Sequence, residues 1–91
     1  MSNYSIEHVK IIKSTRNFKE LYEYCLQHAG EDADALVELS LCYHQGRGIS
    51  KDVELGHHYA ELAAEKGVDR GKAIVAFDLV FGKEVNHHGK I

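Results

Sequence analysis

Proline is absent from this chain, and cysteine occurs only twice in its 91 residues, at Cys25 and Cys42. The sequence therefore lacks the residue that most strongly breaks a helix interior. Each cysteine lies within an apolar helical pattern, where a free thiol behaves as a small buried hydrophobe. We expect a largely helical protein whose thiols stay reduced, and the length of the chain favours a single domain.

Signals for export or membrane insertion are also missing. No run of apolar residues approaches the roughly 18 that are needed to span a bilayer. The N-terminus, MSNYSIEHVKIIK, has neither the apolar core nor the small-residue cleavage site of a signal peptide. We therefore expect a cytoplasmic protein that does not associate with membranes.

Lys and Arg do not gather into a basic cluster. The net charge is −3 and the pI is near 6.1, whereas affinity for the phosphate backbone comes mainly from cations on one face. Hydrophobic residues make up 44% of the chain and charged residues 27%, which indicates a folded chain rather than a disordered one. A nucleic-acid partner is not expected.

Apolar residues recur at spacings of three and four, which predicts amphipathic helices. The first clear helix spans residues 17–30, with Asn17 as its N-cap and Gly30 as its left-handed stop. Its inward positions are Phe18, Leu21, Tyr22, Cys25, Leu26 and Ala29.

Three more helices are predicted at residues 32–46, 52–67 and about 71–82. The second of the four helices opens at Asp32 or Asp34. The expected packing positions of the second and third helices are Leu36, Leu39, Ser40 and Tyr43, then Leu55, Tyr59, Leu62 and Ala63. In the segment SIEHVKII, Ile6, Val9 and Ile12 also have helical spacing.

The middle of the chain recurs in its second half. Adding 36 to the number of a residue maps Ala35 onto Gly71, Leu39 onto Val75, Ser40 onto Ala76, Tyr43 onto Leu79 and Gly46 onto Gly82. A shift of 37 places Leu55 on Phe18 and Tyr59 on Tyr22. The pattern predicts alternating helices in the order B-A-B-A. This register argues against a β-strand over AIVAFDLVF, which the β-branched and aromatic residues would otherwise favour.

One continuous pattern gives the chain a recognisable resemblance. It consists of Ala35, Leu39-Ser40, Tyr43, Gly46-x-Gly48-Ile49 and Asp52, followed by His58-Tyr59, Ala63-Ala64 and Gly67. The pattern resembles the Sel-one-like repeat, a relative of the tetratricopeptide repeat. The resemblance implies a right-handed stack of antiparallel helix pairs, an α-solenoid fragment of about four or five helices that serves as a protein-binding scaffold.

The resemblance covers roughly residues 33–85 and includes departures from the family pattern. We predict a single helical repeat domain with an N-terminal extension at residues 1–16, a preceding B helix at 17–30, a full repeat at 33–67, a partial second repeat at 70–85 and a flexible tail at 86–91. Ser40 stands where the family prefers glycine, Gly56 where it prefers alanine, and Glu84 where Gly48 would recur.

The segment YHQGRGISKD contains the closest pair of glycines in the chain. Gly46 can end a helix at positive φ, and Gly48 lets the chain turn back without a steric penalty. Ile49 can fill the gap between helices, while Ser50 or Asp52 caps the next helix. A phosphate-binding loop is the alternative, but the strand before it and the Gly-Lys-Ser/Thr ending are missing.

The last predicted helix is too apolar for the end of a stack, because only Asp78 is polar between residues 73 and 81. Subtracting 36 aligns Ile74, Phe77 and Phe81 with positions on the helix-A side that lines the concave surface in the repeat family. We therefore predict a partner-binding surface with a polar rim. Its apolar anchors are Leu41, Ile74, Phe77 and Phe81, and its rim is Glu38, Gln45 and Arg47.

Several occupants of this surface stay open. The tail KEVNHHGKI or the segment SIEHVKII can cover it, a second copy can pair with it through the last helix, or another protein can bind it. A further alternative is a dedicated inhibitor or immunity-type protein that neutralises one toxin or enzyme. Glu31, Asp32 and Asp34 would then steer a basic target.

Catalysis, metals and cofactors are not expected. Histidine occurs seven times, including the pairs His57-His58 and His87-His88, but adjacent helical histidines point about 100° apart and rarely share one ion. Cys25 lies in a helix interior without an adjacent oxyanion loop, and so does Cys42, which argues against nucleophilic catalysis.

Overall fold

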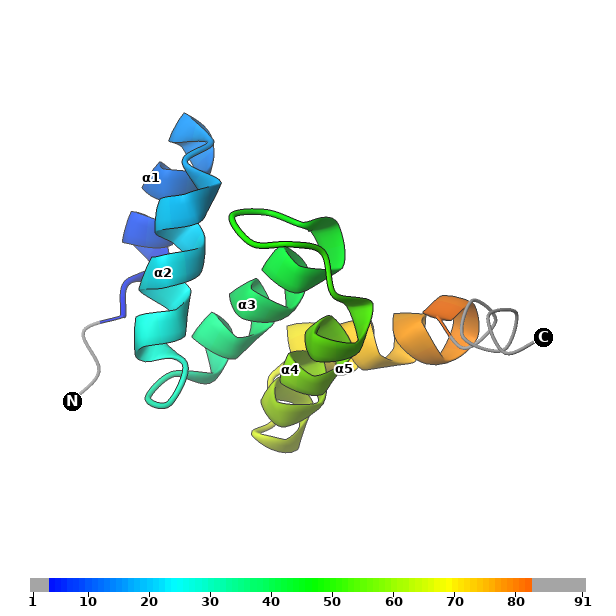
Figure 1. The fold of residues 1–91 in the computed structure, drawn as a ribbon. Helices are drawn as coiled ribbons and strands as arrows, with labels where there is room; N and C mark the ends of the chain where they lie inside the picture. The colour runs from blue at the N-terminus through cyan, green and yellow to red at the C-terminus, as the bar shows by residue number, and fades with distance from the viewer. Residues whose placement is uncertain (1–3, 83–91) are drawn as a thin grey trace.

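The computed structural model describes residues 4–82 of the chain and the side chains of residues 4–80. Five α-helices follow one another, and the fifth continues into a π-helical turn (Figure 1). They are α1 Ile6–Thr15, α2 Phe18–His28, α3 Ala33–Gln45, α4 Val53–Glu65, α5 Asp69–Phe77 and the π turn η1 Asp78–Gly82. No strand occurs within residues 4–82, so the all-α prediction is confirmed and the strand alternative for AIVAFDLVF is wrong.

The helices form an elongated stack in which each packs against the next along the chain (Figure 1). The principal extents are 44 × 26 × 18 Å. Tyr43 of α3 lies between Tyr22 and Tyr59, the two tyrosines that are 37 residues apart in the sequence. Its ring meets Tyr22 of α2 edge-on at 5.7 Å and stacks on Tyr59 of α4 at 5.6 Å. The rings of α2 and α4 thus pack on either side of Tyr43 in α3.

The buried residues form two clusters. The first joins α1, α2 and α3 through Val9, Ile12, Leu21, Cys25, Ala35, Leu39 and Cys42. The second joins α3 and α4 through Leu36, Val37 and Ala63, with Ile74 of α5 packed against it. Because Val9 and Ile12 lie in the first cluster, the segment SIEHVKII does not cover the last helix, and that alternative is wrong. The tail at 83–91 lies outside the described residues.

Helix caps account for most of the predicted helix starts. The side chains of Asn17, Asp32 and Asp52 each accept a hydrogen bond from a first-turn amide of the helix that follows. The prediction for Gly30 is wrong, because α2 ends at His28 with Ala29 as a right-handed C-cap, and Gly30 does not have a positive φ. A left-handed C-cap is found instead at the end of α1, where Arg16 has φ 59°.

The YHQGRGISKD segment comprises the last three residues of α3 and a tight loop, residues 46–52, that joins α3 to α4. Gly46 has φ 68° and Gly48 has φ 76°, as expected for a chain that reverses at these points. A Cβ on Gly48 would overlap the backbone of Phe18 at the start of α2. Ile49 is half-buried against the first cluster. The loop therefore presses its backbone onto α2 as well as joining α3 to α4.

Two predicted packing positions, Leu26 in α2 and Leu55 in α4, face solvent with exposed fractions of 46% and 38%. The periodic pattern includes them because their spacing fits an apolar stripe. The stripe is wider than the surfaces that neighbouring helices cover, so its edge residues remain exposed.

The last helix is rotated relative to the predicted register. Gly71 is buried where expected, and a Cβ there would lie 2.7 Å from the Cβ of Ala63. Ala76 and Leu79, however, are exposed, the latter by 61%, and Asp78 is buried instead. The carboxylate of Asp78 turns inward to meet two histidines, and the π turn that begins at Asp78 shifts the positions of later side chains relative to an α-helix.

Candidate functional site

An open groove of about 450 Å³ lies between the C-terminal half of α3 and the face of α5. Its lining is mostly apolar and consists of Leu41, His44, Gln45, Ala73, Ile74, Phe77 and Asp78. Four of the seven predicted partner-binding residues therefore come together here, two from each helix: Leu41, Gln45, Ile74 and Phe77. Although α4 lies between α3 and α5 in the sequence, the groove is lined by residues of α3 and α5 alone. The fold therefore brings these four residues together.

Of the other three predicted residues, Arg47 and Glu38 do not line the groove. Arg47 lies in the loop after α3, where its guanidinium stands 4.8 Å from the centre of the Phe18 ring. The side chain of Phe81 lies outside the described part of the structure. Glu38 is only 2% exposed, so its predicted place on a solvent-facing rim is wrong.

Glu38 is buried because cations from two other helices neutralise it. Lys13 of α1 lies 2.9 Å from one carboxylate oxygen, and Arg70 of α5 donates to the other at 2.8 Å. Arg70 also donates to Asp34 at 3.0 Å, which is 36 residues earlier in the chain. Sequence periodicity shows which residues share one face of a helix. It does not show which charged residues of different helices meet, so the burial of Glu38 could not be read from it.

The acidic residues proposed to steer a basic target are largely engaged within the fold. Asp32 caps α3. Asp34 accepts hydrogen bonds from the Tyr4 hydroxyl at 2.6 Å and from Arg70. Burial, and then the hydrogen bond to Asp34, raises the pKa of Tyr4 above its usual range. Glu31 lies 3.8 Å from His28 and keeps a half-exposed side chain.

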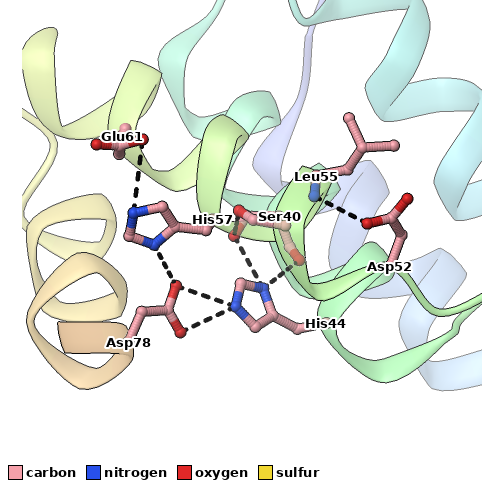
Figure 2. A network of polar contacts seen from close by, with 8 residues as sticks. Ser40, His44, Asp52, Leu55, His57, Glu61 and Asp78 are labelled. Carbon is pink, nitrogen blue, oxygen red and sulfur yellow. Dashed lines mark hydrogen bonds and ion pairs between the residues drawn. The ribbon is translucent and has the colours of Figure 1, made fainter. Parts of the chain in front are cut away.

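Two residues that line the groove, His44 and Asp78, belong to a polar network that sequence reasoning missed (Figure 2). Asp78 is 8% exposed, and its carboxylate accepts from His44 Nε2 at 3.0 Å and from His57 Nδ1 at 2.8 Å. His57 also lies 3.5 Å from Glu61 through Nε2. The network therefore ties the end of α5 to α3 and to α4, and fixes the position of Ile74 and Phe77 along the groove.

Both ring nitrogens of His44 face acceptors. Nδ1 lies 2.8 Å from the backbone carbonyl oxygen of Ser40, and Nε2 faces the Asp78 carboxylate (Figure 2). A neutral imidazole has one N–H and can satisfy only one of these acceptors, whereas the imidazolium donates to both. A single carboxylate in an apolar helix, with histidines on neighbouring predicted helices, is the sequence signal that would have indicated this network.

The side chains of Ser40, His44 and Asp78 contact one another in the sequence serine, histidine, aspartate, as in a catalytic triad. The serine, however, is not available as a nucleophile. Ser40 is fully buried, and its hydroxyl donates to the backbone carbonyl oxygen of Gly56 at 2.7 Å. A Cβ on Gly56 would overlap the ring of His44. Ser40 and Gly56 therefore allow α3 and α4 to approach closely, and the Ser40 hydroxyl serves this contact.

The two cysteines are buried in the first core cluster, as predicted. Burial, and then the nearby Glu38 carboxylate, raises the pKa of Cys25 from 9.0 to about 12 and that of Cys42 to about 11. Such thiols form little of the thiolate that acts as a nucleophile.

We expect slow labelling of both thiols in the native protein at neutral pH. Because the thiolate population of Cys25 is about a thousandfold lower than at a pKa of 9.0, a disulfide reagent should react rapidly only in urea. Above pH 9.0 the unfolded chain loses thiol protons that the folded chain keeps, so the free energy of unfolding should also fall as the pH rises towards 12. Rapid native labelling of either thiol would contradict its burial and would reopen the case for nucleophilic catalysis.

Within residues 4–82, no three His, Cys, Asp or Glu side chains gather in an arrangement that could hold a metal ion. His87 and His88 lie outside the described residues. None of the described helices has the length and apolar character needed to cross a membrane.

Comparison of the chain with protein-family models, with curated proteins and with solved structures gives no significant match. The resemblance to the Sel-one-like repeat therefore stays a prediction based on the residues that carry it.

Proposed function

We propose that this protein is a small interaction module that binds a partner protein through the groove between α3 and α5. The main support is that Leu41, Ile74 and Phe77, from two helices far apart in sequence, line one apolar groove of about 450 Å³. A groove of this size accommodates the apolar side chains of a docked segment. In this proposal Gln45 contributes a polar contact at the edge of the groove.

The proposal assigns binding rather than catalysis to the groove. A helical scaffold with a preformed apolar groove loses little conformational entropy when a partner docks. A Sel-one-like origin of the fold and a cytoplasmic location belong to the same proposal. The inhibitor alternative has less support, because Asp32 and Asp34 contribute to capping and ion pairing within the chain.

Selection of peptides from a displayed library tests this function directly. The wild-type chain is expected to enrich peptides with two or three apolar residues at helical spacing, and Phe77→Asp should weaken their binding at least tenfold. Phe77 is 60% exposed, so the variant should keep its helix content by circular dichroism.

Ile11→Asp is the matched control for this experiment. Ile11 is also 60% exposed but lies on α1, away from the groove. Binding should survive in this variant. Peptides that bind Phe77→Asp as tightly as wild type, or a library that gives no enrichment, would exclude the groove as the binding site. Unfolding of Phe77→Asp would show that the side chain belongs to the core.

A further inference from the structure

One buried carboxylate joins the end of α5 to the two helices beside it. Among residues 76–80, Asp78 alone is buried, and the residues on either side of it are exposed. Within the described residues, the ion-pair partners of Asp78 are His44 of α3 at 3.0 Å and His57 of α4 at 2.8 Å (Figure 2). Histidine changes its charge between about pH 5 and 8, so this attachment depends on the proton concentration.

The hydrogen bonds of His44 require a proton on each ring nitrogen or on the group it faces. Nδ1 lies 2.8 Å from the carbonyl oxygen of Ser40 and 3.3 Å from its hydroxyl oxygen. That hydroxyl donates its own proton to the carbonyl oxygen of Gly56, so it can only accept from Nδ1. Nε2 faces both carboxylate oxygens of Asp78, at 3.0 and 3.1 Å. Because a neutral imidazole carries one N–H, either the His44 ring or the Asp78 carboxyl must hold one further proton.

The other titratable groups around Asp78 belong to α4. His57 Nδ1 lies 2.8 Å from the Asp78 carboxylate, and a neutral ring with its proton on Nδ1 satisfies this contact. His57 Nε2 lies 3.5 Å from Glu61, whose side chain is 53% exposed. The Glu61 carboxylate favours a charged His57 ring, so it acts in the same direction as Asp78. The closed network therefore holds at least one proton more than a neutral His44 and an ionised Asp78 hold when they are apart.

We propose that His44, His57 and Asp78 form a proton-dependent latch, which holds the end of α5 against α3 and α4 at mildly acidic pH and loosens as the pH rises. A free histidine side chain has a pKa of about 6.5 and a free aspartate about 3.9. Above about pH 6.5, closing the latch takes up one proton, so each further pH unit weakens the latch by up to tenfold. Just below that pH, the released His44 already carries the proton, and the latch is fully formed.

The groove between α3 and α5 shares two residues with the latch. His44 and Asp78 line it together with Ile74 and Phe77. Loss of the hydrogen bonds to Asp78 frees the end of the wall that α5 contributes, so partner binding should weaken over the same pH range. This consequence rests on the proposed function, whereas the latch itself does not.

Urea unfolding of the full chain between about pH 5.5 and 8.5 tests the latch. In Asp78→Asn, the amide can donate to a neutral His44 and accept from His57, so the network closes without the further proton. The ratio of the wild-type unfolding constant to that of Asp78→Asn should therefore rise at least tenfold between about pH 6.5 and 8.5. Titrating groups outside the network are common to both chains and cancel in this ratio.

His58→Gln is the matched control. His58 is exposed on α4, and its ring contacts Tyr59. This variant should keep the pH dependence of the wild type. If it loses that dependence instead, the proton binds outside the network and the inference is overturned.

His44→Gln is a second variant, which removes the ring that takes up the proton. It should lose the pH dependence as Asp78→Asn does, and folding of either variant is sufficient for the comparison. An equal pH dependence in the wild type and in the variant that folds would overturn the inference. So would a failure of both variants to fold at every pH, because the network would then be required whether or not it holds the further proton.

Peptide binding over the same pH range separates the latch from the proposed function. Affinity that falls as the pH rises supports control of the groove by the latch, and affinity that does not change contradicts that control. A chain with pH-dependent stability that binds no peptide keeps the latch and contradicts the proposed function. A chain that binds peptides but lacks the pH-dependent stability keeps the groove and overturns the latch.

Discussion

Replacing Gly48 with alanine is expected to lower the free energy of unfolding by about 2–5 kcal/mol. Gly48 has φ 76°, a conformation that costs an L-residue about 1–2 kcal/mol. The added Cβ would also overlap the carbonyl of Phe18 and approach the Cα of Lys19 to 2.9 Å. Backbone atoms at the start of a helix cannot rotate away as a side chain can, so the loop must lift from α2. Urea denaturation followed by circular dichroism measures the loss.

Gly67→Ala is the control that isolates the clash from the backbone strain. Gly67 has φ 88° at the end of α4, and nothing lies within 4 Å of the position its Cβ would take. This variant should lose only about 1–2 kcal/mol. Equal losses in the two variants would show that the loop does not press on α2, and the role of Gly48 would reduce to its conformation.

Removing both cations from Glu38 is expected to cost about 3–5 kcal/mol, because an unpaired charge is then left in the interior. The side chain of Glu38 is 3% exposed, and Lys13 and Arg70 are its ion-pair partners. Lys13→Met and Arg70→Met together keep most of the packing of the long side chains while removing both charges. For a domain whose total stability is about 5–15 kcal/mol, this loss is large.

Rescue by a third substitution distinguishes charge burial from lost packing. Adding Glu38→Met to the double variant removes the buried charge and should recover much of the loss, because apolar replacement of a buried ion network is often neutral or stabilising. Arg70→Met alone should cost less than the double change, since Lys13 remains 2.9 Å from Glu38. A triple variant no more stable than the double would show that packing, rather than charge, determines the effect.

The candidate site was predictable from the sequence in its apolar part. The 36-residue shift marked Ile74 and Phe77 as surplus to the packing positions, and aligned them with Glu38 and Leu41 on the earlier helix. The groove contains three of these four residues, and Glu38 is the exception. Glu38 has the periodicity of a surface residue, and its burial depends on Lys13 and Arg70 arriving from helices 25 and 32 positions away.

The rotation of the last helix was not predictable by the same means. From the apolar pattern alone, the side of the helix with more apolar residues is expected to face the core, and Leu79 lies on that side. In the structure Asp78 faces inward instead, because two histidines on α3 and α4 hydrogen-bond its carboxylate. A charged group that is paired and hydrogen-bonded in the interior loses the penalty that would otherwise exclude it.

Local chemistry in the sequence determined the helices, their caps at Asn17, Asp32 and Asp52, and the glycine turn that joins α3 to α4. These features depend on residues within a few positions of one another, so a linear pattern contains them. Only the tertiary structure decided which polar groups are buried, which face of α5 turns inward and where the groove opens. Each of those depends on charges and shapes that meet across helices, and their energies arise only when the helices pack.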